Sequence, residues 1–153
     1  MTPALDNLEI ALRLGAALLA GALIGLDREI KKRPAGLQTH ALVSLGAALT
    51  LLVVAVGSGP AGDPASRVVQ GIITGIGFLG AGVILQYERE RRVEGLTTAA
   101  SIWSAAALGM ACGAGYFDLA GLALAAIVLV LVAGGWIEGW MERRGVGNKE
   151  KQR

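Results

Sequence analysis

Five long stretches of the chain contain no Asp, Glu, Lys or Arg, and short polar segments separate them. These stretches are Leu14–Leu26, Leu37–Gly62, Val68–Tyr87, Gly95–Phe117 and Leu119–Ile137. Four of them reach the length of about 17–25 residues that a helix needs to span a membrane. The pattern therefore predicts an all-α fold, a polytopic transmembrane bundle of five helices.

The first stretch is too short to span alone, since as a helix it covers about 20 Å of a hydrocarbon core that is about 30 Å thick. We expect this helix to begin at Leu5 or Leu8, which places Arg13 inside it. Either Arg13 extends to the headgroups, or it is buried and faces a polar partner within the bundle. Because Met1–Glu9 has no basic residue, we do not expect a cleaved signal peptide.

The last two stretches are separated by a single charged residue, Asp118. As one helix, residues 95–137 would be about 64 Å long, which is twice the thickness of the membrane. We expect a hairpin that breaks at Gly113–Asp118, where the glycines permit a tight turn. Trp136 and Trp140 suit the membrane interface at the far end of the last helix.

The positions of Lys and Arg predict the orientation, because short loops rich in these residues stay in the cytoplasm. Of the 14, twelve lie in residues 27–40, in residues 86–94 or after Ile137. We expect the amino terminus outside and the carboxyl terminus in the cytoplasm. Residues 1–140 form the transmembrane domain in this interpretation, and residues 141–153 form a short charged cytoplasmic tail.

Small residues recur at every fourth position in three of the predicted helices. They are Ala17, Gly21 and Gly25, then Gly71 and Gly75, and finally Thr97, Ser101, Ala105, Gly109 and Gly113. Helices in lipid associate through close packing at such positions. These positions predict a tightly packed bundle, and they would also allow a homodimer. Two roles are open for the glycines: they serve helix packing alone, or they also make room for a ligand.

Composition excludes several classes of function. The net charge is +2 and the basic residues have no interleaved aromatics, so we expect no nucleic-acid partner. Cys112 is the only cysteine and His40 the only histidine, which excludes an intramolecular disulfide and a two-histidine zinc site in one chain. Without a GxSxG elbow or paired intramembrane carboxylates, we expect no catalytic residues, no cofactor and no enzyme. No metal ligand is identified.

A glycine-rich string, residues 75–80, matches the dinucleotide fingerprint GxGxxG. That fingerprint works between a β-strand and a helix, and here it lies inside a membrane span. We therefore expect no nucleotide. The glycines instead allow a kink, a close helix crossing or a small cavity.

The polar segment after the first span has two interpretations. Asp27-Arg28-Glu29 and Lys31-Lys32-Arg33-Pro34 form a solvated anchor, or Asp27 or Glu29 folds back over the bundle as a ligand or gate for a cation such as Mg²⁺. His40 begins the second span as either a hydrogen-bonding or a proton-sensitive residue.

Four strings together resemble the MgtC/SapB family of bacterial membrane proteins over about residues 10–117. They are residues 25–29 (GLDRE), 33–40 (RPAGLQTH), 75–82 (GIGFLGAG) and 95–103 (GLTTAASIW). The resemblance implies an inner-membrane protein whose relatives are linked to growth at low Mg²⁺, to survival in host cells and to restraint of the F-type ATP synthase. Transport has been proposed for the family.

This chain departs from the family pattern at two positions. Gln38 stands where the family usually has Arg, and Asp27 stands where Glu is common. We expect a short form without the cytoplasmic carboxyl-terminal domain of long members, so roles that depend on that domain are not carried over.

The leading hypothesis is a non-enzymatic protein that supports cation or membrane-energy homeostasis by contacting another membrane complex, with the F-type ATP synthase as the implied partner. The alternative is a channel or transporter for Mg²⁺ or another small solute. Its path would use the span residues Gln70, Thr74, Thr97, Thr98, Ser101 and Ser104.

Alternating spans bring the four strings to the same side of the membrane. The predicted functional cluster comprises Asp27, Arg28, Glu29, Pro34, Gly36, Gln38, Thr39, His40, Gly75, Gly77, Gly80, Gly82, Thr97, Thr98 and Trp103. We expect Arg28 to pair with a carboxylate, Thr97 and Thr98 to supply hydroxyls, and the glycines to admit a ligand near the backbone. The alternative is that the strings encode only helix-to-loop transitions and packing.

Overall fold

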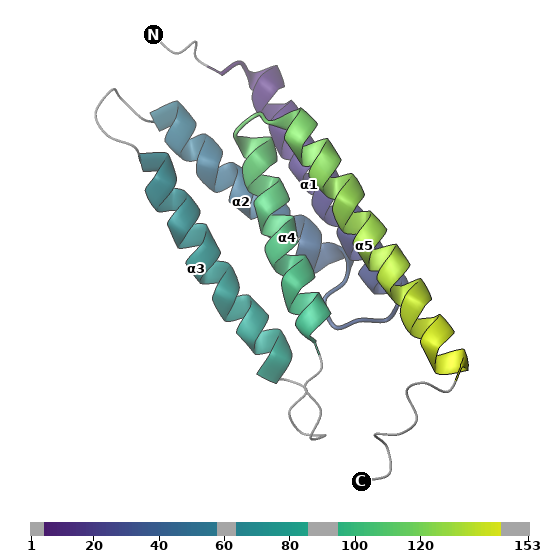
Figure 1. The fold of residues 1–153 in the computed structure, drawn as a ribbon. Helices are drawn as coiled ribbons and strands as arrows, with labels where there is room; N and C mark the ends of the chain where they lie inside the picture. Colours follow the sequence, from purple (N-terminus) through teal and green to yellow (C-terminus); the bar gives the residue numbers. More distant parts are fainter. Residues whose placement is uncertain (1–4, 58–63, 86–94, 145–153) are drawn as a thin grey trace.

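Five helices make up the part of the chain that the structure describes, and all run roughly along one axis (Figure 1). The computed structural model describes residues 5–57, 64–85 and 95–144. Its helices are α1 (Asn7–Ile30), α2 (Leu37–Gly57), α3 (Pro64–Leu85), α4 (Leu96–Gly113) and α5 (Phe117–Arg143). All five are long and apolar enough to cross a membrane. The prediction of an all-α bundle with five spans is confirmed.

The centre of the bundle is made of α1, α2 and α4, which contact one another (Figure 1). Helix α3 lies against α4 and α2 on one side, and α5 lies against α4 and α1 on the other. The end of α1, the start of α2, the end of α3, the start of α4 and the end of α5 lie at the same end of the bundle. We call it the motif end, because three of the four strings reach it and the fourth lies in the last part of α3.

Local sequence sets the helix ends. Helix α1 begins where the Asp6 side chain accepts a hydrogen bond from the Leu8 amide, a typical N-cap. This start agrees with the expected one. Helix α4 ends with hydrogen bonds from Gly115 N to Cys112 O and from Tyr116 N to Ala111 O, both 2.9 Å long, and Gly115 has φ +85°. That is a Schellman motif, and it confirms the predicted hairpin.

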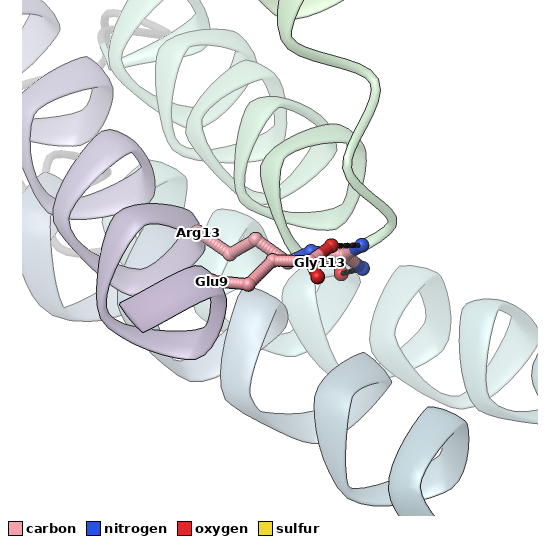
Figure 2. A network of polar contacts seen from close by, with 3 residues as sticks. All are labelled: Glu9, Arg13 and Gly113. Atoms are coloured by element: carbon pink, nitrogen blue, oxygen red, sulfur yellow. Dashed lines mark hydrogen bonds and ion pairs between the residues drawn. The ribbon is translucent and has the colours of Figure 1, made fainter. Parts of the chain in front are cut away.

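Arg13 points from α1 to the carboxyl-terminal end of α4 (Figure 2). Its Nη1 donates to the Gly113 carbonyl over 2.9 Å, and its Nη2 pairs with Glu9. The side chain is 13% exposed. The last carbonyls of a helix lack partners within the helix and attract a cation. Of the two alternatives for Arg13, the structure shows the partner inside the bundle.

Helix α2 crosses α1 at backbone distance because α1 has glycines at the crossing. A Cβ at Gly25 would lie 2.6 Å from Leu37 Cα, and one at Gly21 would overlap the His40 carbonyl. At the same crossing, Ser44 Oγ donates to the Ala17 carbonyl over 2.7 Å. The predicted small face of the first span is therefore the α1–α2 contact.

Helix α4 also crosses α2 at backbone distance. A Cβ at Gly113 would lie 2.7 Å from the Ala48 carbonyl oxygen, and one at Gly109 would overlap the Ser44 carbonyl. Ala105 and Ser101, one and two turns before Gly109, are also buried. The predicted small face of the fourth span is confirmed as well, except that Thr97 at its start is exposed.

The small-residue stripe of α3 does not pack within the described bundle. A Cβ added at Gly71 or Gly75 would meet nothing within 4 Å. Among the residues of α3 whose burial the structure describes, only Gly80 is buried. The expectation of a close crossing at this stripe within one chain is wrong, because α3 turns most of its surface outward. A homodimer that uses the stripe stays a prediction.

Replacing Gly109 by Ala should destabilise the protein, because the new methyl group would overlap the Ser44 carbonyl. Overpacking of this kind costs about 1–3 kcal/mol. Gly75→Ala is the matched control, and it should stabilise α3 by about 0.5–1 kcal/mol, since an Ala there meets no neighbour. Thermal unfolding of the purified proteins in detergent measures both changes. Equal shifts in Tm would contradict the crossing described here.

Candidate functional site

A buried arginine joins the end of α1 to the start of α4. Arg28 is 4% exposed, and its Nη2 donates to Thr98 Oγ1 over 2.9 Å. Thr98 is itself buried. A buried charge is costly unless it is hydrogen-bonded, so this contact constrains both helix ends. The pairing of Arg28 with a carboxylate stays a prediction.

His40 extends this polar cluster into α2 and is fully buried. Its Nδ1 lies 2.8 Å from the Gly36 carbonyl and its Nε2 lies 2.9 Å from Ser101 Oγ. Ser101 Oγ in turn lies 2.8 Å from the Thr98 carbonyl. We call Arg28, His40, Thr98 and Ser101 the polar cluster.

The partners of His40 suit two protonation states. The Gly36 carbonyl can only accept, so Nδ1 carries a proton. The single proton of Ser101 can go to His40 Nε2, which leaves the ring neutral. It can instead go to the Thr98 carbonyl, and the ring then donates from both nitrogens and is cationic. Both interpretations of His40, as a hydrogen-bonding and as a proton-sensitive residue, therefore stay open.

Glu29 caps the next helix across the loop. Its Oε2 accepts a hydrogen bond from the Leu37 amide over 3.1 Å, which satisfies one of the free donors at the start of α2. A side chain at Gly36 would collide with this carboxylate. The string that contains Pro34 and Gly36 thus builds a compact helix-to-helix connection.

Lys31 ties α1 to α5. Its Nζ lies 2.8 Å from Asp27 Oδ1 and donates over 2.8 Å to the Leu131 carbonyl. Gly135 lies beside this ammonium group, and a Cβ there would be 3.3 Å from Nζ. Asp27 is therefore an ion-pair partner and Glu29 is a helix cap. Both carboxylates have protein partners, and their alternative role as a ligand or gate for a cation stays a prediction.

A cavity of about 520 Å³ opens at the motif end between α1, α4 and α5. Its charged lining residues are Arg28, Lys31 and Arg33, with Thr97 and Thr98 beside them. Gly95, at φ +89°, starts α4 without a side-chain cap. Among the residues that the structure describes, no carboxylate lines the cavity and no group of three His, Cys, Asp or Glu could hold a metal. Its chemistry suits an anion.

Several members of the predicted cluster lie apart from this site. Gly75, Gly77 and Gly82 face open space, and only Gly80 approaches α4, where its Cβ would lie 3.5 Å from Ala99. Other members are exposed and do not line the cavity, namely Pro34, Gln38, Thr39 and Trp103, whereas Thr97 is exposed and lines it. Gln38 and Thr39 precede His40 directly, so helical periodicity turns them away from the face that His40 buries.

Sequence reasoning missed three contributors to the site. Ser101 was assigned only to packing and to the transport alternative, although it lies one turn after Thr98 on the same face. Lys31 and Arg33 were interpreted as part of a solvated anchor. The contact from Lys31 to Leu131 spans one hundred residues, and no local pattern indicates it.

Comparison with known proteins agrees with the resemblance. Residues 14–140 match the sequence model of the MgtC family. Protein SrpB of Synechococcus elongatus is 46% identical over 124 residues, which cover 74% of this chain and 68% of SrpB. Protein MgtC of Salmonella typhimurium is 46% identical over 122 residues, and MgtC of Brucella abortus is 43% identical over 117 residues. These matches cover 80% and 76% of this chain but 49% and 48% of the two MgtC proteins, so the chain spans about half their length. No solved structure matches it.

Replacing Lys31 by Met should destabilise the protein by about 1–2 kcal/mol, because it leaves the largely buried Asp27 carboxylate without its partner. Adding Asp27→Asn should recover part of this loss, since it removes the stranded charge. Lys32→Met is the control, because Lys32 is exposed. Chemical unfolding in detergent measures all of these variants. If the double variant is less stable than Lys31→Met alone, the ion pair does not have this role.

Proposed function

Since this chain belongs to the MgtC family of bacterial multi-pass membrane proteins, we propose that it supports Mg²⁺ or membrane-energy homeostasis as a non-enzymatic protein of the inner membrane. The observation that supports this proposal best is the polar cluster. It links the strings at the end of α1, the start of α2 and the start of α4 through buried hydrogen bonds.

The proposed mode of action is contact with another membrane complex at the motif end. The cluster holds the buried positive charge of Arg28 near His40, whose partners suit two protonation states. Such an arrangement can respond to a nearby charge, or it can hold the start of α4 in position. The F-type ATP synthase, implied by the family resemblance, is the candidate partner.

The transport alternative has less support from the geometry. Gln70 and Thr74 are exposed on α3, and Thr74 Oγ1 donates over 2.8 Å to the Gln70 carbonyl of its own helix. Thr98 and Ser101 are engaged in the polar cluster. The residues named on α3 therefore lie apart from those named on α4, and the cavity at the start of α4 is lined by three cationic side chains among the described residues.

We also propose that the motif end faces the cytoplasm, because the loops on that side hold most of the Lys and Arg. Single cysteines in a Cys112→Ala background test this, since Cys112 is buried and its loss leaves one reactive thiol. With an impermeant thiol reagent on intact cells, Tyr116→Cys should label and Lys32→Cys should not. Both positions are exposed. The reverse pattern would contradict the orientation.

The functional role of the cluster predicts that Arg28→Gln, Glu29→Gln and Thr98→Val abolish rescue of a deletion strain in low-Mg²⁺ medium. Gln at position 29 can still accept from the Leu37 amide, and Arg28→Gln removes the buried charge together with its hydrogen bond, so these two variants should lose about 1 kcal/mol. Thr98→Val instead takes the Thr98 acceptor from the buried guanidinium and should cost about 1–3 kcal/mol, so the abundance of each variant is measured separately. Lys32→Gln removes one positive charge from the same loop and should rescue fully. Immunoblots of membranes verify abundance.

Two further results bear on this proposal. Subunits of the partner complex should co-purify with the wild-type chain and with Lys32→Gln but not with the three site variants. Full rescue by all three site variants would show that the cluster is structural only. Cation flux in liposomes that contain the purified protein alone, lost with Thr98→Val, would instead favour the transporter.

A further inference from the structure

The cationic cavity continues into a second, apolar one. The second cavity has a volume of about 260 Å³ and lies between α4 and α5. It shares the lining residues Thr97, Val130 and Leu131 with the first. The two cavities together form a site with one charged end and one apolar end.

The apolar cavity offers almost no polar group to a ligand. Its lining includes Ala100, Ala126 and Ile127. The hydroxyl of Ser104 donates to the Ala100 carbonyl over 2.9 Å, and that of Ser101 belongs to the polar cluster. From Thr97 to Ser104 the cavity follows α4 for about 10 Å, at about 1.5 Å per residue. Its shape and chemistry suit a hydrocarbon chain.

The charged cavity suits a phosphate group. Arg28, Lys31 and Arg33 line it, and Asp27 offsets one of these charges through its ion pair with Lys31. Leu96 and Thr97 line it too, and the first amides of a helix point away from the helix body. These donors add to the attraction of the three cations for an anion.

The depth of the two cavities indicates the source of the phosphate. The charged cavity lies at the ends of α1 and α4, where headgroups meet a spanning helix, and the apolar cavity lies further along α4 inside the span. A free phosphate would use only the first. We propose that the paired cavities bind one anionic phospholipid, with its phosphate between Arg28 and Arg33 and an acyl chain between α4 and α5.

This inference goes beyond the proposed function, because it is tested on the purified chain without any partner or growth phenotype. Native mass spectrometry of the full chain, released from detergent micelles, measures lipid binding directly. Short-chain phosphatidylglycerol should bind about tenfold or more tightly than phosphatidylcholine with the same chains, since each nearby Lys or Arg contributes about fivefold. Equal affinities would overturn the proposal.

Two exposed neighbours test the charged end. Arg33→Gln should weaken phosphatidylglycerol binding about fivefold, because Arg33 lines the cavity. Lys32→Gln removes the same charge from the adjacent exposed position, which does not line the cavity, and should bind as the wild type does. Equal weakening by both variants would indicate diffuse attraction to the loop and would overturn the site. Circular dichroism verifies that each variant is folded.

Two neighbouring alanines test the apolar end. Ala126→Phe places a ring in the apolar cavity and should weaken phosphatidylglycerol binding, whereas Ala125→Phe adds the same ring at an exposed position outside it. Inorganic phosphate should displace the lipid only weakly. If Ala126→Phe has no effect and inorganic phosphate binds as tightly as the lipid, the ligand is a soluble phosphate and the lipid proposal is wrong.

Discussion

The close approach of the α2 backbone to α1 and α4 is the constraint on which the rest of the structure depends. In lipid, apolar side chains gain little by leaving their surroundings for one another, so helices need backbone proximity and hydrogen bonds to associate. Gly21 and Gly25 on one side and Gly109 and Gly113 on the other permit that proximity. Since α2 touches both partners at once, the registers of α1 and α4 are set relative to each other, which brings residue 28 to residue 98.

The polar cluster forms because this register brings its residues together, and burying the charge of Arg28 in it costs free energy. The buried guanidinium of Arg28 must be hydrogen-bonded to be tolerated, and Thr98 supplies an acceptor from a position seventy residues away in the chain. Helix α5 is held differently, because Lys31 donates to a carbonyl of its middle while small residues play a lesser part. Both cavities lie beside this helix, between it and α4.

The sequence predicts those features of the fold that depend on local hydrophobicity and residue spacing. The five spans, the turn around Gly115 and the small faces of α1 and α4 were all recognisable, because each is encoded within one segment. The site was predicted only in part. His40 is buried while its neighbours Gln38 and Thr39 are exposed, and this depends on how α2 is rotated toward α4. The glycines of α3 look like those of α1 in sequence, but they lie on a helix that turns them outward. Nothing local distinguishes the two cases.

The sign of the charge at the motif end restricts how the proposed link to Mg²⁺ can work. The described charged residues that line the cavity, Arg28, Lys31 and Arg33, repel a divalent cation, and the described carboxylates beside it, Asp27 and Glu29, are engaged as an ion-pair partner and a helix cap. A link to Mg²⁺ then has to be indirect, through something that both the cation and the cavity attract. Phosphate oxygens meet that requirement, because Mg²⁺ binds phosphates as hard oxygen ligands and Arg binds the same groups through paired hydrogen bonds. If the cavities hold an anionic lipid, Mg²⁺ and the protein compete for one headgroup, and scarcity of the cation favours the occupied protein by mass action alone.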